Sequence, residues 1–358
     1  MSDRTGARRG YLGYLLLRLA QAAIVILLAY VLIFVVVSVL PGDPVTNLLR
    51  DPQSGLTEAD IHKIVVYYGL NQPVLIQLAL SLSRFVVGQL GYSLQSNLPV
   101  TQVIGDAVPS TLVLAGTALL FSVVLALGIA YGSQYAPGAR VRQTLRSVPS
   151  FFLSVPNFVI GLVLISFFSF RLHTFSVIDP DGLVATLFAA LTLAIPVSAP
   201  LAEVFIANLD HESKQEYALV AKSRGLAPVA LFARHLVKPS LLPAVTMVAL
   251  IVGELLGGSV ITETIYGRDG IGTVVQKAVT TQDVPVLQAV VSLAAVVFVL
   301  VNLLADLVSP LVDPRVEIRS PARASRAPRP SKPSKPARPS KPSQPPQPAQ
   351  PSSQGASA

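Results

Sequence analysis

Six long apolar runs constrain this chain more than any other feature of its sequence. A helix needs about 20 apolar residues to cross the roughly 30 Å of hydrocarbon in a bilayer. The runs that meet this requirement are residues 19–40, about 111–135 within 107–139, 147–170, 182–202, 239–262 and 284–305. We therefore predict an all-α, polytopic membrane protein with six transmembrane helices.

The composition supports this class and excludes others. Hydrophobic residues make up 52% of the chain and charged residues only 13%, whereas soluble domains carry about 25% charged residues. The chain has no cysteine, which excludes disulfides and cysteine-ligated metals. The first apolar run is longer than the 7–15 residues of a signal-peptide core, and no small-x-small site follows it, so we interpret it as a retained anchor.

Lys and Arg are unevenly distributed over the segments that connect the runs. Basic residues predominate before the first run, after the second, after the fourth and in the C-terminal tail. Acidic residues outnumber them in 41–106, 171–181 and 263–283. By the positive-inside rule, both termini are cytoplasmic. This orientation divides the chain into a cytoplasmic N-terminus (1–18), a first span (19–40), an external segment (41–106), a core of five spans (107–308) and a cytoplasmic tail (309–358).

The external segment 41–106 has a helical pattern. LTEAD (56–60) is typical of a capped helix start, with Thr57 at the N-cap. A second apolar stretch, 74–87, is too short for a confident seventh span. We predict a small helical cap on the outer face, and the alternative is a loop without regular structure.

The tail is rich in proline and in cations. Residues 309–358 contain nine Lys or Arg and two acidic residues, whereas residues 1–308 contain eighteen basic and seventeen acidic residues. Most of the net charge of +8 therefore lies in the tail, and it gives little support for nucleic-acid binding. From Arg323 to Lys341 a cation recurs every third residue, which would place them along one edge of a polyproline II helix. Anionic lipid is a candidate partner. A disordered, solvated tail that binds nothing is the alternative.

The segment 205–242 is a polar interruption between the fourth and fifth runs. Its core predicts two helical pieces separated by Gly225. The first piece begins at Glu216, where an acid suits the helix dipole. The second begins near Pro228, which is allowed in a first turn, and runs to Pro239. Such a helix, joined to two spans, could fit a groove on another protein; an ordinary amphipathic connector is the alternative.

Several motifs in this order resemble one known family. The interrupting segment carries Glu216-Tyr217, Ala221, Arg224-Gly225-Leu226, His235 and Leu242-Pro243. Further similar stretches are LPGDPV (40–45), YGLNQPVLIQ (68–77), ITETIYGRDGIG (261–272), DVPVLQ (283–288) and NLLADLVSPLVDPRV (302–316). Over residues 10–317 the chain resembles permease subunits of binding-protein-dependent ABC importers, dipeptide/oligopeptide subfamily. It departs from the broad motif of this segment at Leu219-Val220, where Glu-Ala is usual.

The resemblance implies a transport subunit in a prokaryotic cell membrane. Its partners would be a second homologous permease, two ATP-binding cassette ATPases and an external solute-binding protein. The segment 205–242 would be the coupling (EAA) loop, which contacts an ATPase through Glu216, Tyr217, Ala221, Arg224, Gly225 and Leu226. Peptides are the expected cargo; nickel chelates and glutathione, or an ion-coupled secondary carrier, are the alternatives.

The chain itself carries no recognisable catalytic chemistry. It has no G-x-x-x-x-G-K-[ST] phosphate loop, so ATP is expected on the partner subunits and the chain is not expected to be an enzyme. The four histidines are scattered, and no metal site is expected. Glu254 is the one charge inside the fifth run, and we interpret it as the only buried acid. It would either line the transport pathway or form a hydrogen bond to the partner permease.

Overall fold

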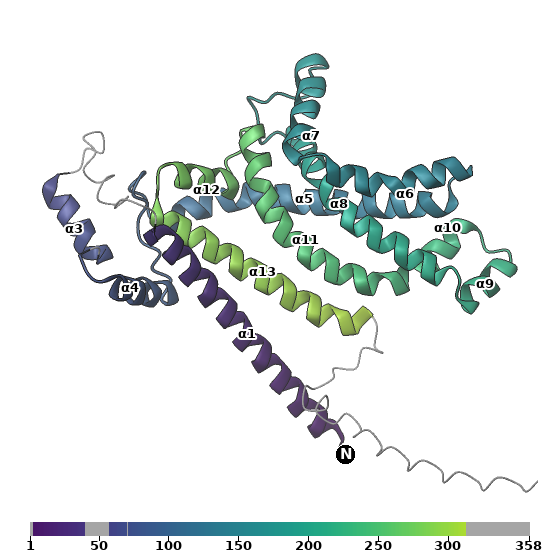
Figure 1. Ribbon diagram of the computed structural model, residues 1–358, viewed down its shortest axis with the longest axis horizontal. Coiled ribbons are helices and arrows are strands. Elements are labelled where there is room, and N and C mark those ends of the chain that lie inside the picture. Colours follow the sequence, from purple (N-terminus) through teal and green to yellow (C-terminus); the bar gives the residue numbers. More distant parts are fainter. Residues whose placement is uncertain (1–2, 40–56, 70, 313–358) are drawn as a thin grey trace, which may run out of the picture. The chain divides into compact units, whose positions relative to one another are not determined.

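A computed structural model describes residues 3–39, 57–69 and 71–312, and every regular element in these ranges is helical (Figure 1). The first part of the chain forms α1 (Asp3–Val39), α3 (Glu58–Tyr68), α4 (Val74–Val86) and α5 (Val100–Tyr135). Then follow α6 (Ala139–Ser154), α7 (Asn157–Leu164), η2 (Ile165–Arg171) and α8 (Leu183–Glu212). The last part forms α9 (Glu216–Ser223), α10 (Pro228–Leu231), η3 (Phe232–Leu236), α11 (Val237–Tyr266), α12 (Ile271–Thr280) and α13 (Val284–Val312).

The helices that are long and apolar enough to cross a membrane agree with the expected architecture. Five spans qualify in the described residues: Leu17–Val36, Val100–Tyr135, Leu183–Glu212, Thr246–Tyr266 and Val284–Ala305. A sixth is obtained if α6 and the α7–η2 pair count as one bent span. The all-α, multi-pass class is therefore confirmed. Several helices run well beyond the apolar runs, because the polar residues at their ends continue the same helix.

The third span is the one that the sequence described incorrectly. Residues 147–170 were expected to form one helix, but the helix axis turns by 99° between α6 and α7. Val155 is extended and Pro156 precedes the first residue of α7. Proline cannot donate a backbone hydrogen bond and disfavours helical geometry in the residue before it. Pro156 thus ends α6, whereas Pro149, inside α6, does not.

The core lies where α5, α8 and α11 meet, and α6 packs along α5 and α8. Many of its fully buried residues are alanines, among them Ala118, Ala126, Ala130, Ala189, Ala190 and Ala194. Small residues let the backbones of neighbouring helices approach closely, which is how membrane helices commonly associate. A second cluster joins the start of α5 to α12 and the start of α13 through Val100, Ile104, Ala278 and Val286.

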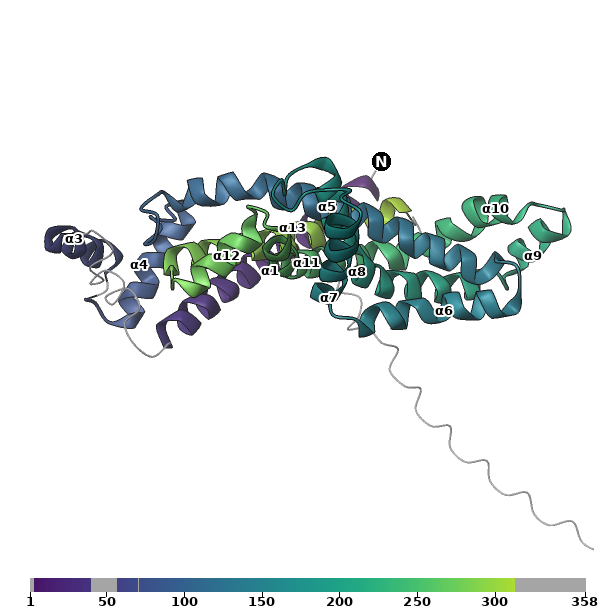
Figure 2. The same cartoon turned by 90° about the horizontal axis from the view of Figure 1, so that it is seen from above.

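The two ends of the long helices carry different short elements. α9 and α10 lie at the end where α8 finishes and α11 begins, and α12 lies at the other end (Figures 1 and 2). The expected cap contains α3 and α4, which confirms that residues 57–106 are helical in part. LPGDPV and the rest of 40–56, and the tail from residue 313, lie outside the described residues. α13 reaches Val312, a little beyond the expected boundary at 308.

Candidate functional site

The segment between α8 and α11 has the expected helix–bend–helix form. α9 begins at Glu216 and carries Lys222 in its last turn, so both charges suit the helix dipole. Gly225 follows with φ of +75°, a left-handed conformation that favours glycine. A Cβ at Gly225 would meet no atom within 4 Å. The glycine is therefore required by backbone geometry alone, and the bend predicted there is confirmed.

The second helical piece does not end where the sequence suggested. Helical residues continue from Pro228 through η3 into α11 without interruption, past Pro239, to Tyr266. The five π-helical residues of η3 end three positions before this proline, and a π-turn changes the local hydrogen-bond pattern. The non-helical part of the segment is therefore much shorter than 205–242. α10 is continuous with a membrane-spanning helix.

The residues expected at the coupling loop divide into two sets. Ala221 and Leu226 pack against the hydrophobic core of the protein, beside the buried Ala218. Glu216, Tyr217, Arg224 and Gly225 are exposed. The exposed set is extended by apolar side chains that the sequence reading did not select: Leu219, Val220 and Val229. This end of the protein thus presents a surface of apolar and charged side chains, which we call the α9 surface.

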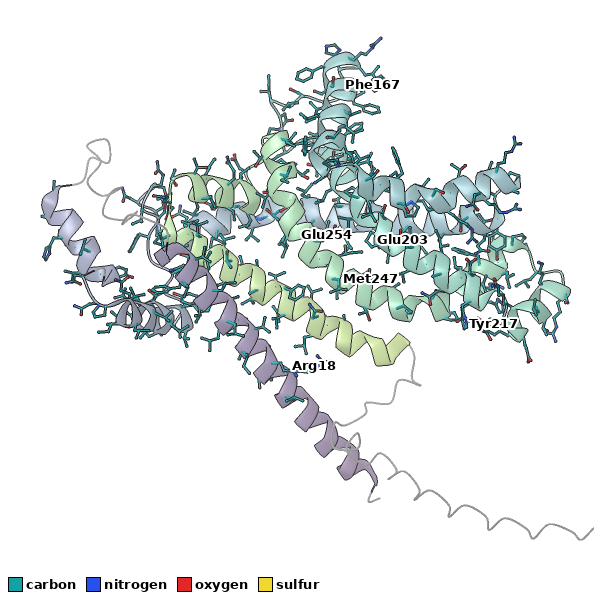
Figure 3. The ribbon with its side chains drawn as sticks, in the orientation of Figure 1. Arg18, Phe167, Glu203, Tyr217, Met247 and Glu254 are labelled. Carbon is teal, nitrogen blue, oxygen red and sulfur yellow. The ribbon has the colours of Figure 1, made fainter. Side chains whose placement is uncertain are left out.

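Tyr217, which Figure 3 labels at this end, connects the α9 surface to α8. Its hydroxyl donates a hydrogen bond to Oε2 of Glu212. Partial burial, and secondly this hydrogen bond and the charge of Glu212, raise the pKa of Tyr217 well above its usual range. The tyrosine therefore stays neutral and keeps donating at any physiological pH.

An ion pair holds the base of this segment to two other helices. Arg146 of α6 donates two hydrogen bonds to Asp210 of α8, at 2.7 and 2.8 Å, and Gln134 of α5 donates a third. The rings of Tyr131 and Tyr135 pack on Phe232 of η3 at 5.1 and 6.4 Å. The sequence reading missed Asp210, because its partner lies 64 positions away and nothing local distinguishes it from the neighbouring acids Glu212 and Glu216.

Arg146→Ala should loosen this connection. A bidentate arginine–carboxylate pair that is about one-third exposed contributes about 1 kcal/mol. We expect thermal unfolding of the detergent-solubilised chain at a temperature a few degrees lower than for wild type. Arg140→Ala, on the same helix and exposed, is the matched control. Equal unfolding temperatures for the two variants would show that the pair does not stabilise the fold.

Glu254 lies on a face of α11 that no other described element covers. The exposed residues of α11 recur at three- and four-residue spacing along its whole length: Pro239, Pro243, Thr246, Leu250, Glu254, Gly257, Ile261 and Thr264. We call this set the α11 stripe. Glu254 is exposed, as is Glu203 of α8 (Figure 3). The expectation that Glu254 is the only buried acid is therefore wrong. Its carboxylate and two threonines make the stripe unsuited to lipid.

The acid that is buried is Glu263, which the sequence reading placed just outside the fifth span. Its Oε1 accepts a hydrogen bond from the Thr111 hydroxyl at 2.7 Å, and its Oε2 accepts one from the Gly272 N–H, also at 2.7 Å. Thr111 in turn accepts the N–H of Ile271 at 2.8 Å. These bonds connect α11 to α5 and to the start of α12. The sequence contained a signal for this arrangement in residues 263–272, where Glu263 is followed by Arg268 and by two closely spaced glycines, Gly270 and Gly272.

Arg268 completes this cluster from the turn between α11 and α12. Its guanidinium is almost fully buried and donates to the Pro180 carbonyl (2.6 Å), the Thr186 hydroxyl (2.7 Å) and the Ser110 hydroxyl (3.1 Å). It also pairs with Asp181 at 3.1 Å. Together with Glu263 it brings α5, α8, α11 and α12 to one point, which we call the Glu263–Arg268 cluster. Most of its hydrogen-bonding groups have partners within the protein, with the buried Nε of Arg268 as the exception, which indicates a structural role.

Two further features are the distribution of possible metal ligands and one large cavity. Within the described ranges no three His, Asp or Glu side chains come together as metal ligands. A cavity of about 590 Å³ lies among α1, α5, α11, α12 and α13. Valine, leucine, alanine and glycine line most of it, with Thr111 and Ser259 as polar exceptions. It is an apolar space without the charged groups that a nucleotide needs.

Comparisons with known proteins agree on one family. A family model described as "Binding-protein-dependent transport system inner membrane component" matches residues 118–318. The chain is 29% identical over 299 residues to the probable peptide ABC transporter permease protein y4tP of Sinorhizobium fredii (strain NBRC 101917 / NGR234), covering 81% of this chain and 95% of that protein. It is 30% identical to the glutathione transport system permease protein GsiC of Salmonella choleraesuis (strain SC-B67), covering 82% and 94%.

A solved structure shares the fold. A chain of the MetNI methionine ABC transporter, in inward-facing conformations, superposes with a TM-score of 0.51 at 16% sequence identity. The match covers 98% of that chain and 60% of this one. At this identity the likeness concerns the arrangement of helices only.

Proposed function

This chain belongs to the family of binding-protein-dependent transport system inner membrane components, and from that membership we propose that it is the permease subunit of an ATP-driven importer that takes up peptides. It is a multi-pass protein of the cell membrane, and its relatives are transport subunits. ATP would be bound and hydrolysed by separate ATPase subunits. The observation that carries this proposal is the α9 surface, because it is an exposed, partly apolar patch fixed to two spanning helices.

The α9 surface is the proposed contact for an ATPase. Exposed Val220, Leu219 and Tyr217 supply apolar area, and Arg224 supplies positive charge at its edge. α9 follows α8 after three residues, and α10 is continuous with α11. Displacement of the α9 surface by a closing ATPase pair would therefore move both spanning helices. We place this surface, and both chain termini, on the cytoplasmic side, as the distribution of Lys and Arg predicts.

The α11 stripe is the proposed contact for the second permease subunit and the edge of the transport pathway. A carboxylate with two threonines on one face of a spanning helix is costly in lipid, so another protein or an aqueous path should cover this face. Within this chain no described element does so. A homologous permease facing the stripe would complete the pathway between the two subunits, with an external solute-binding protein delivering cargo at the end that carries α12.

Peptides are the proposed cargo because one of the relatives is a probable peptide permease. Another relative is a glutathione permease, and glutathione is itself a small peptide. A nickel chelate remains an alternative. An ion-coupled carrier would need inverted repeats with ion sites at broken helices, whereas this chain belongs to a family of binding-protein-dependent transport components. The proposed contact between the basic tail and anionic lipid concerns residues outside the described ranges and stays a prediction.

Glu254→Gln tests the pathway side of this proposal. The change keeps the size of the side chain and its ability to form hydrogen bonds, with an NH2 donor in place of one acceptor oxygen, but removes its charge. If Glu254 borders the pathway, uptake of peptides with a cationic side chain should fall about fivefold, equivalent to about 1 kcal/mol, with neutral peptides little affected. Uptake assays in vesicles containing the complete transporter would measure this difference. If the uptake of both cationic and neutral peptides were unchanged, Glu254 would not border the pathway.

A further inference from the structure

α4 is too short to cross a membrane, yet its composition is that of a membrane helix. It has 13 residues, which gives a length of about 20 Å against the roughly 30 Å of hydrocarbon. Arg84 is its single charged residue. α4 also lies outside residues 118–318, the part that the family model matches. The relatives align over a share of this chain that includes α4, but their descriptions give this helix no role.

The charge of Arg84 is directed to α3 and not to the remaining surface of α4. Its Nη1 donates a hydrogen bond to the Tyr67 carbonyl. Its guanidinium carbon also lies 4.3 Å from the centroid of the Tyr67 ring, a cation–π contact. α3 occupies this side of α4. The opposite surface of α4 is consequently free of charge.

The contact between α4 and the first span places α4 level with the apolar part of the bilayer. The rings of Tyr30 and Phe85 lie 4.8 Å apart. Tyr30 belongs to the span Leu17–Val36 and is almost fully buried. It lies six residues before the end of that span, or about 9 Å below it at 1.5 Å per residue. α4 therefore packs on α1 within the membrane-spanning part of α1 and not above it.

The charge-free surface of α4 is apolar and exposed. Leu75 is 80% exposed and Val86 is 78% exposed, and Val74, Ile76 and Val87 are exposed beside them. No residue of α4 is fully buried. The neighbouring span α1 also exposes apolar side chains, including Leu28, Leu32 and Val35. Both α4 and the first span that it contacts therefore expose apolar side chains.

We propose that α4 is an interfacial helix that lies in one leaflet of the membrane, with Leu75 and Val86 in contact with acyl chains and α3 above it. Short amphipathic helices of this type are held by the burial of their apolar face. Because Arg84 is engaged by α3, the contact needs no anionic headgroup. The proposal depends on the membrane location of α1 and on neither the cargo nor the ATPase.

Single tryptophans can report this contact, because the chain contains no tryptophan. The variants are Leu75→Trp and Val86→Trp, each in the purified full-length chain in phosphatidylcholine nanodiscs. His62→Trp, at an exposed position on α3, is the matched control. Quenching is measured with acrylamide from the water and with brominated acyl chains from the bilayer. We expect about half the acrylamide quenching of the control at both α4 positions, and bromine quenching only there.

Two further measurements decide whether lipid or a protein contacts the exposed surface of α4. Adding anionic lipid to the nanodiscs should leave the quenching of both α4 variants unchanged. Acrylamide access equal to that of His62→Trp at both α4 positions would overturn the proposal. If that access were then lost on adding the solute-binding protein, the α4 surface would be a protein docking site instead. Size-exclusion chromatography of each variant confirms that the reporters describe folded protein.

Discussion

Replacing Gly272 with alanine is expected to prevent the chain from folding stably. A Cβ at this position would lie 2.5 Å from the Cα of Val260 and 2.7 Å from Oε2 of Glu263. The first contact is with backbone, which cannot rotate away as a side chain can. Displacement of the turn would also break the hydrogen bond between the Gly272 N–H and Glu263, leaving a buried carboxylate short of a partner. We expect a loss of about 3 kcal/mol or more.

The measurement is the yield of monodisperse protein after extraction, followed by thermal unfolding. Gly128→Ala is the matched control, because a Cβ at Gly128 in α5 would meet no atom within 4 Å. Alanine is also the better helix former by about 1 kcal/mol, so this control should fold at least as well as wild type. If Gly272→Ala matched Gly128→Ala in yield and unfolding temperature, the Glu263–Arg268 cluster would not have the structural importance assigned to it.

Val220→Glu should abolish recruitment of the ATPase while leaving the permease folded. Val220 is 50% exposed on the α9 surface, so the fold tolerates a charge there. At a docked interface the same carboxylate would be desolvated without a partner, which costs about 2 kcal/mol or more. We expect the ATPase retained on co-purification to fall at least about thirtyfold, and peptide uptake to be lost with it.

The control for this variant is Val141→Glu. Val141 is 49% exposed and lies on α6 near Arg142 and Arg146, outside the α9 surface. It introduces the same charge at a valine of equal exposure, so it separates a local docking effect from a general effect of added charge. If equal amounts of ATPase were recovered with both variants, the α9 surface would not be part of the interface with the ATPase. This conclusion would hold whether or not peptide uptake was lost.

The parts of the fold that follow from local sequence could be predicted. The spans follow from length and hydropathy, because no other structure satisfies the backbone of 20 apolar residues in lipid. The bend at Gly225 follows from glycine's access to positive φ, between two segments that each carry helix-start signals. The sequence also shows that Leu219-Val220 replaces the Glu-Ala that is usual in the broad motif of this segment. The structure shows that these two side chains are exposed and add apolar area to the α9 surface.

What could not be predicted depends on residues that meet only after folding. Glu263 is buried because Gly270 and Gly272, seven and nine positions later, allow the turn to close over its carboxylate. Asp210 and Arg146 lie on different helices, and neither neighbourhood identifies the other as its partner. The break at Pro156 was hidden because the apolar residues continue on both sides of it. Hydropathy records which residues enter a membrane but not the direction of their helix.

The alanine-lined contact between α5 and α8 has a mechanical consequence. Ala118, Ala126 and Ala130 of α5 and Ala189, Ala190 and Ala194 of α8 are fully buried and have no side-chain rotamers to exchange. The middle of this helix pair is therefore held by close backbone approach and not by large interlocking side chains. Its two ends are fixed by polar links, the Gln134–Asp210 hydrogen bond at one end and the bonds from Arg268 to Ser110 and Thr186 at the other, so a relative movement of α5 and α8 would have to break one of these links.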